Sequence, residues 1–254
     1  MSKLVRSLFL TAAFIAAGAH AQTPAGDYHQ HVFSMEAIKL AGPQTSLQPL
    51  DAKGVVALLD EAGIRKATLL SLAYMFGNSD IQLDDPAHVA RLREVFAAAN
   101  AAKLTIVVHM RASVSRGRPY GGRQATIFIE QLLPAAPDVT VQVAHFAGMG
   151  PGYEDPPSRE AMAVFAAAMA RHDPRTRNLW LDVASIVDRG IKPELAKLVV
   201  DTIRQVGTDK VLYGTDSAQG GNQSPRASWE AFRRLPLTEA EFAQIARNVP
   251  PYWR

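Results

Sequence analysis

The stretch VTVQVAHFAG, residues 139–148, is an almost unbroken run of apolar residues with a histidine near its end. A strand with one face in water alternates apolar and polar residues, whereas a strand covered on both faces is apolar throughout. We therefore expect a buried strand here. Helices are expected on either side, near residues 123–133 and from Ser158, a residue suited to capping a helix, to about Arg171. This order of helix, strand and helix favours a parallel sheet covered by helices.

The same alternation extends over the rest of the chain. Apolar runs predict further strands at residues 67–74, 104–110, 179–185 and 210–216, and residues 26–33 have the character of a strand end. Helical spacing predicts helices at residues 51–62, 85–101, 193–206 and 238–248. Asp85 and Pro86 suit the start of a helix, and Gly63 and Gly207 suit the position just after one. With no linker or repeat after residue 25, the series predicts one α/β domain with parallel strands.

Residues 1–21 have the pattern of a secretory leader. Lys3 and Arg6 precede the apolar stretch Leu8–Ala17, and Ala19-His20-Ala21 is a small-x-small cleavage pattern. The alternative, a membrane anchor, needs about 20 apolar residues, and this stretch is shorter. We therefore expect a signal peptide that ends at Ala21, a mature domain over residues 22–254, and a periplasmic or secreted protein.

Composition excludes several classes of function. The chain has no cysteine, which rules out disulfides, thiolate metal ligands and a cysteine nucleophile. Without Lys3 and Arg6 the formal charge falls from +3 to +1, so the charge balance gives little reason to expect an acidic partner. Arg116, Arg118 and Arg123 cluster, but no aromatic residues are interleaved with them as nucleic-acid binding would favour. We expect no nucleic acid and, for the mature chain, no membrane; the oligomeric state is left open.

Polar residues lie at the ends of several predicted strands. In GDYHQHVF, residues 26–33, His29 and His31 stand two positions apart, which places both side chains on one side of a strand. His109 and His145 end apolar runs, and Asp216 ends KVLYGTD. Each alone is better explained as a core or capping residue. Together they indicate a metal or proton-transfer site, because the carboxyl ends of parallel strands form one face.

The ordered set of His-x-His, His, His and Gly-Thr-Asp resembles the amidohydrolase superfamily, and more closely its amidohydrolase-related group, which includes TIM-barrel decarboxylases. The resemblance extends from about residue 27 to about residue 248. It implies a TIM-like barrel of parallel strands, in which GDYHQHVF is similar to the first strand. IVVHMR, VQVAHFAG and KVLYGTD are similar to strands five, six and eight.

The resemblance also implies roles for single residues. His29, His31 and His109 would be metal ligands, and Asp216 would bind the metal or its water and accept a proton. His145 would lie beside the metal and stabilise charge that develops on the substrate. Imidazoles with one carboxylate suit Zn²⁺, and Mn²⁺ or Fe²⁺ less well. Bound Zn²⁺ lowers the pKa of water from ~16 to about 7, which makes hydroxide available at neutral pH.

The chain departs from the family between its second and fifth strand equivalents. Residues 75–103 would have to hold strands three and four, yet 85–101 is predicted to be helix. Residues 75–84 are too short for two strand-helix units. No lysine matches the family's fourth-strand lysine, which can bridge two metals. We expect one metal ion and a shortened or incomplete barrel with residues 74–84 lining the gap, and open strand edges are usually covered.

Smaller expectations concern substrate binding. Arg111, two residues after His109, would hold a substrate carboxylate, or else is a surface arginine. The loop 113–124 is suited to a lid over an anionic substrate, or is a plain connection. Asp182 faces the pocket or positions His145, and residues 153–155 are candidates for the rim.

Three functions remain as alternatives. The first is a secreted metal-dependent hydrolase that cleaves an amide, lactone or similar bond of a small molecule. The second is non-oxidative decarboxylation of a small carboxylic acid on the same scaffold, because both reactions use the same ligand set. The third is a catalytically impaired protein that binds a metal or ligand.

Overall fold

The computed structural model describes residues 22–43, 46–70, 82–111, 119–148, 150, 153–187, 190–216 and 224–253. Three regions discussed above therefore lie wholly or partly outside the described residues. They are the leader, the segment 74–84 and the loop 113–124.

The described residues form strands at the six predicted places, each shorter than the predicted segment. They are β1 (Asp27–Gln30), β2 (Ala67–Leu69), β3 (Ile106–Val108), β4 (Val141–Val143), β5 (Leu179–Asp182) and β6 (Val211–Leu212). Every pairing between them is parallel, as predicted. The register of β1 on β2 shifts between Asp27 and Gln30, the segment that contains His29.

The strands form two ladders that meet at β1. One ladder pairs β1 with β2, and the other runs in the order β3, β4, β5, β6. The backbone N–H of Tyr28 donates to Tyr213 O over 3.0 Å, and that of Asp216 donates to His29 O over 2.6 Å. These bonds place β1 beside the chain that leaves β6. Within the described residues the order is therefore β2, β1, β6, β5, β4, β3, a parallel barrel shortened between β2 and β3.

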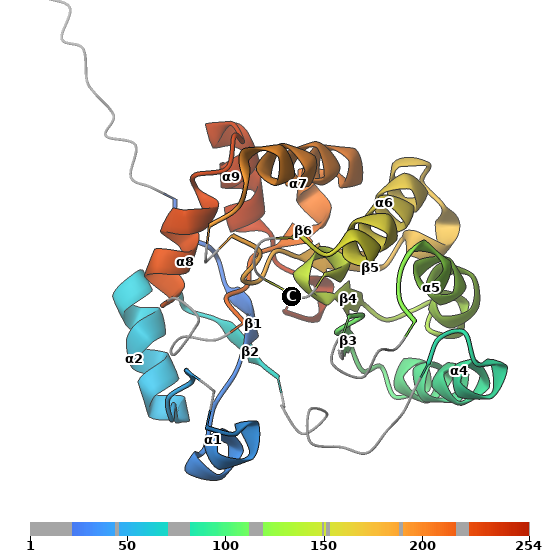
Figure 1. The fold of residues 1–254 in the computed structure, drawn as a ribbon, viewed down its shortest axis with the longest axis horizontal. Helices are drawn as coiled ribbons and strands as arrows, with labels where there is room; N and C mark the ends of the chain where they lie inside the picture. Colours follow the sequence, from blue (N-terminus) through green and yellow to red (C-terminus); the bar gives the residue numbers. More distant parts are fainter. Residues whose placement is uncertain are drawn as a thin grey trace, which may run out of the picture.

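Helices surround the strands (Figure 1). They are α1 (Met35–Ala41), α2 (Ala52–Ala62), α4 (Pro86–Ala101), α5 (Gly122–Ile127), α6 (Pro156–Ala170), α7 (Pro193–Val206), α8 (Pro225–Phe232) and α9 (Glu239–Arg247). A π-helical turn, η2 (Phe128–Leu132), continues α5. Single 3-10 turns are η3 (Leu133–Ala135), η4 (Ala144–Ala147), η5 (Pro174–Thr176), η6 (Thr208–Lys210) and η7 (Pro251–Trp253). Among the helices described, none has the length and apolar character needed to cross a membrane.

The ends of these helices follow local sequence with one exception. Asp85 caps α4 with Pro86 in its first turn, and Gly63 ends α2 at a left-handed φ of 73°. Ser158 was expected to cap α6, and this prediction is wrong. The helix begins at Pro156, two residues earlier. Pro156 and Pro157 both fit the first turn, because the N–H groups of a first turn have no partner within the helix and proline lacks this group. Ser158 instead donates its hydroxyl to Asp155 Oδ2 over 2.7 Å.

The turn η7 contacts strands of both ladders. Trp253 packs on the small buried cluster of Tyr28, Trp180 and Leu212. Its indole N–H donates to Thr68 Oγ1 on β2 over 3.1 Å. The hydroxyl of the preceding Tyr252 donates to Gln142 Oε1 on β4 over 3.0 Å. Residues near the end of the chain thus bridge strands that the shortened barrel leaves unpaired with each other within the described residues.

Candidate metal centre

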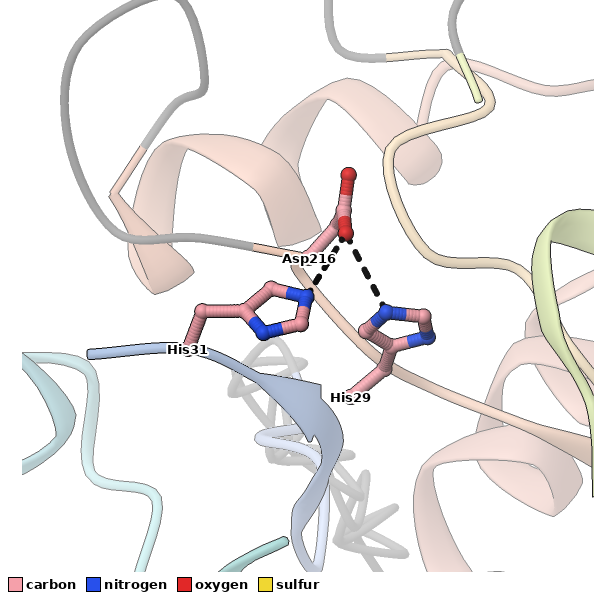
Figure 2. Close-up of side chains that lie close together, drawn as sticks. All are labelled: His29, His31 and Asp216. Atoms are coloured by element: carbon pink, nitrogen blue, oxygen red, sulfur yellow. Dashed lines mark hydrogen bonds and ion pairs between the residues drawn. The ribbon is translucent and has the colours of Figure 1, made fainter. Parts of the chain in front are cut away.

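The end of β1 presents two buried histidines to one carboxylate (Figure 2). Nε2 of His29 lies 3.1 Å from Asp216 Oδ1, and Nε2 of His31 lies 3.2 Å from the same oxygen. The expectation that residues two apart on a strand face one side is therefore met. Because His29 and His31 are 2% and 3% exposed, neither ring is freely hydrated.

Asp216 reaches this position through an unusual backbone conformation. Its φ is 67°, in the left-handed region that aspartate enters more readily than most residues do. The N–H bond to His29 O holds the backbone there, and Ser185 Oγ lies 3.3 Å from Asp216 Oδ2. Oδ1 is thereby turned toward the histidines, while the side chain as a whole keeps 24% of its surface exposed.

His145 approaches the same carboxylate from a left-handed turn after β4. His145, Phe146 and Ala147 have φ values of 52°, 52° and 65°, although none is glycine. Such residues persist only where surrounding contacts fix them. Here the N–H of His145 donates to Asp182 Oδ1 over 2.9 Å, and the Tyr153 hydroxyl donates to Phe146 O. Nε2 of His145 then lies 3.8 Å from Asp216 Oδ1.

The other ring nitrogen of each histidine fixes its tautomer. Each Nδ1 bonds an oxygen that can only accept, so it carries the hydrogen in the neutral ring. These oxygens are Asp182 Oδ2 for His29 (3.1 Å), Leu70 O for His31 (2.9 Å) and Ala184 O for His145 (2.8 Å). Three Nε2 lone pairs and a carboxylate oxygen consequently converge. Acceptors gathered in this way are stabilised by a proton or a metal cation between them.

The spacing of these acceptors fits a metal ion. Two sets of described side chains bring ligand atoms within 4.8 Å of one another. They are His29, His31 and Asp216, and His29, His145 and Asp182. Ligand atoms at ~2.0–2.1 Å from a tetrahedral ion lie about 3.3 Å apart. The separations of 3.1 and 3.2 Å in the first set are close to that value.

The pKa values of the cluster are set by two opposing effects, the burial of each group and the charges of its neighbours. Burial acts to lower the pKa of His29, but Asp182 and Asp216 raise it to about 10. Burial acts to raise the pKa of Asp216, but His145, His29 and His31 hold it well below its usual range. A proton on His29 thus neutralises the carboxylates when no cation is bound, and a metal ion that binds would displace it.

Asp182 holds two of the histidines, His29 and His145, through hydrogen bonds. It is fully buried on β5 and accepts four N–H bonds, two on each oxygen. Oδ2 accepts from His29 Nδ1 and Gln142 Nε2, and Oδ1 accepts from the backbone N–H groups of His145 and Ala184. Burial acts to raise its pKa, yet His29 brings the pKa down to about 2. Asp182 therefore positions His29 as well as His145.

His109 belongs to the cluster but not to either set of ligand atoms. Its ring centroid lies 4.6 Å from that of His145. Burial, and then His145, lower its pKa to about 3, so the ring is neutral, as a metal ligand must be. Its proposed place in the ligand set remains a prediction.

Arg111 lies just beyond β3, and its contacts include a carboxylate and an aromatic ring. Its Nε donates to Asp155 Oδ2 over 3.0 Å, and its guanidinium lies 5.2 Å from the centroid of the Tyr120 ring. The Tyr120 hydroxyl donates to Ala147 O, in the turn that carries His145. Arg111 and the predicted rim residue Asp155 are thus connected to the histidine cluster through Tyr120. Residues 113–118, half of the predicted lid, lie outside the described residues.

Sequence reasoning missed two buried groups that support the site. Gln142 interrupts the apolar run of β4, and this interruption was the signal that could have found it. Asp27 accepts N–H bonds from His29 and Thr215 and the Thr215 hydroxyl, which ties β1 to the chain after β6. Burial raises the pKa of Asp27 to about 6 despite these bonds.

The fold and the His/Asp cluster together define a metal-binding α/β barrel protein. A family model described as amidohydrolase matches residues 55–248. This match spans most of the chain, and the chain belongs to the amidohydrolase family, which is a family of enzymes. Among curated proteins, none matches the sequence.

Solved structures share the fold at low identity. An amidohydrolase from Burkholderia multivorans with bound zinc is 12% identical, with a TM-score of 0.55 over 87% of this chain and 95% of that chain. A putative 2-pyrone-4,6-dicarboxylic acid hydrolase from Pseudomonas putida is 13% identical, with a TM-score of 0.51 over 88% and 94%. A 5-carboxyvanillate decarboxylase from Sphingomonas paucimobilis is 14% identical, with a TM-score of 0.51 over 88% and 96%. These likenesses confirm a TIM-like barrel, here in a shortened form.

Proposed function

We propose that this chain is a metal-dependent hydrolase with one divalent ion, Zn²⁺ in preference to Mn²⁺ or Fe²⁺. His29, His31 and Asp216 are the ligands, and His109 completes the set. The observation that carries the proposal is the convergence of the Nε2 atoms of His29, His31 and His145 on Asp216 Oδ1. The zinc bound by the Burkholderia multivorans amidohydrolase supports the choice of ion.

When bound, the ion supplies a Lewis acid that makes hydroxide available from water near neutral pH. The chain's own groups then divide the remaining work. Asp216 Oδ2 is the outward oxygen of the carboxylate and accepts the proton from the attacking water. His145 Nε2 faces the same space. Because Nδ1 already donates to Ala184 O, Nε2 stabilises the negative charge that forms on the substrate oxygen once it has taken up a proton. The site would act on an amide, a lactone or a similar bond of a small molecule.

Arg111 is proposed to bind an anionic group of the substrate. Its guanidinium keeps its place through Asp155 and the Tyr120 ring, so little entropy is lost when it binds a carboxylate. An arginine beside the metal cluster also favours the second candidate, non-oxidative decarboxylation of a small carboxylic acid. The similar Pseudomonas and Sphingomonas proteins are a putative hydrolase and a decarboxylase, respectively, so both kinds of reaction occur among the similar structures.

Metal content and products test this proposal together. The purified chain is loaded with Zn²⁺ or Mn²⁺, and bound metal is measured for wild type, His29→Ala, Asp216→Asn and the control His172→Ala. His172 is exposed just after α6 and lies outside the cluster. Wild type and His172→Ala are expected to hold about one ion per chain. Retention of the full ion by His29→Ala would overturn the site.

Activity is measured on panels of lactones, esters, amides and aromatic carboxylic acids. Release of an acid or alcohol by water supports the hydrolase, and release of CO₂ supports the decarboxylase. If wild type binds one ion and Asp216→Asn matches it on every substrate that wild type turns over, Asp216 is not the base. If wild type turns over no member of any panel while holding its ion, the impaired binding protein replaces the enzyme.

The proposal includes export to the periplasm or beyond. Lys3, Arg6 and the apolar stretch that follows them support a cleaved leader. Expression in a bacterial host followed by fractionation tests this. The mature protein is expected outside the cytoplasm with an N-terminus near Gln22, and an uncleaved cytoplasmic protein would overturn it.

A further inference from the structure

An unbroken series of hydrogen bonds connects η7 with the candidate metal ligand His29. It begins at Trp253 Nε1, which donates to Thr68 Oγ1, and Thr68 Oγ1 lies 3.5 Å from the Tyr252 hydroxyl. Tyr252 donates to Gln142 Oε1, and Gln142 Nε2 donates to Asp182 Oδ2 over 2.7 Å. Asp182 Oδ2 in turn accepts from His29 Nδ1 over 3.1 Å.

The chemistry of the two ends sets the direction of every bond. An indole nitrogen can only donate and an ionised carboxylate can only accept. Gln142 Nε2 lies between two acceptors, Asp182 Oδ2 and Tyr28 O at 3.0 Å, which use both of its hydrogens. Its Oε1 must therefore face the Tyr252 hydroxyl as the acceptor. The orientation of the amide follows from these partners and has no alternative that keeps them all bonded.

Burial makes each of these bonds matter. Gln142 and Asp182 are fully buried, so neither can exchange a lost partner for bulk water. Burial also raises the pKa of Tyr252 to about 12, which keeps its hydroxyl protonated and able to donate. Without that donor, Gln142 Oε1 has no hydrogen to accept. A rotated amide would place Oε1 against two acceptors, Asp182 Oδ2 and Tyr28 O, and would remove a donor from the carboxylate that holds His29.

We propose that Tyr252 is a positioning residue for the metal centre. Acting through Gln142 and Asp182, its hydroxyl holds His29 with Nδ1 protonated and Nε2 directed at the ion. The inference rests on the proposed function, because it takes His29 as a ligand. It assigns to η7, a turn far from β1 in sequence, a share in the affinity of the site for its metal.

The test compares Tyr252, which is half-buried, with Tyr213, which is buried. Tyr252→Phe removes only the hydroxyl of the series, and Tyr213→Phe removes a buried hydroxyl that donates to Pro225 O over 2.8 Å outside it. Affinity for Zn²⁺ and Co²⁺ is measured by competition with a chelator, and the visible spectrum of the Co²⁺ form reports its ligand geometry. Partners of a ligand histidine contribute about 10- to 100-fold in affinity. Tyr252 acts two bonds further away, so roughly a threefold to tenfold loss is expected.

A double-mutant cycle separates this role from general packing. Gln142→Met keeps the size of the side chain but interrupts the series, so adding Tyr252→Phe should then cause no further loss of affinity. The melting temperature of the metal-free protein is expected to fall equally for Tyr252→Phe and Tyr213→Phe. Equal metal affinity for these two variants would overturn the inference, as would full additivity of Tyr252→Phe with Gln142→Met. In either case loss of the ion by His29→Ala would leave the proposed function standing.

Discussion

Nε2 of His31 lies 3.2 Å from Oδ1 of Asp216, although 185 residues separate them along the chain. The first strand and the chain that follows the last strand therefore supply the two sides of one site. Neither side forms a metal site alone. The His-x-His pair offers two imidazole nitrogens without a negative charge, and Asp216 offers a single carboxylate. The junction between β1 and the chain after β6 brings these side chains together as a candidate cation site.

Replacement of Asp182 by Asn should destabilise the metal-free protein. Each oxygen of Asp182 accepts two N–H bonds, so an amide nitrogen at either place would face two donors. A loss of about 1–3 kcal/mol in the free energy of unfolding is expected from such buried, unmatched groups. Urea unfolding measures it. Asp201→Asn, which removes only an exposed contact with Lys197, should change little, and an equal loss in both variants would contradict the role of Asp182.

Replacement of Arg111 by Lys should affect binding of anionic substrates more than turnover. Lysine keeps the charge beside Asp155 but loses the planar fork and its contact with the Tyr120 ring. Loss of one charge-assisted bond is expected to raise KM about tenfold for substrates with a carboxylate. Steady-state kinetics with a carboxylate substrate and its uncharged ester check this. Equal effects on both substrates would remove Arg111 from substrate binding.

Glu241 should make the stability of the fold depend on acid pH. Its carboxylate accepts from Arg204 Nε over 2.6 Å, and this pair together with the capping box at Thr238 lowers the pKa of Glu241 from 4.5 to about 2. A depressed pKa stabilises the folded state fully above 4.5, and this contribution is lost as the pH falls toward 2. Acid titrations followed by circular dichroism should show a smaller loss for Glu241→Gln than for wild type in that window. Glu94→Gln, on an exposed part of α4, should follow wild type.

His172→Gly should stabilise the protein. His172 follows α6 with a φ of 54°, a conformation that costs energy for any residue with a Cβ atom. Glycine removes this cost, and a gain of about 0.5–1 kcal/mol in the free energy of unfolding is expected. His88→Gly, inside α4, should instead lose about 1 kcal/mol. Thermal melts of both variants test this prediction. A loss of stability in His172→Gly as well as in His88→Gly would show that the positive φ of His172 does not destabilise the protein.

Several features could be predicted from the sequence because their causes are local. Mainly apolar runs mark β4 to β6 because these strands are buried along their length, and β3 shows the same pattern although it is half-buried. Asp85 and Gly63 mark helix ends because their own side chains or conformations make the cap. The polar residues at strand ends were found because parallel strands share one edge.

Other features depend on distant partners and were missed. Nothing near Tyr252 in sequence indicates that its hydroxyl meets Gln142, 110 residues away. The left-handed turn at His145 contains no glycine that would have signalled it, because contacts from Asp182 and Tyr153 impose it. Helices α1 and α8 were also not predicted, and the start of α6 was placed too late.

The contact between β1 and the chain after β6 is expected to form late in folding. Strands β3 to β6 pair with neighbours next along the chain, whereas the pairing of β1 with the segment after β6 closes a loop that spans nearly the whole domain. Contacts of such long range form late, because closing the loop costs entropy before the contacts are gained. The histidine cluster is therefore assembled near the end of folding. An ion bound there would slow unfolding far more than it would speed folding, and so lengthen the lifetime of the native barrel.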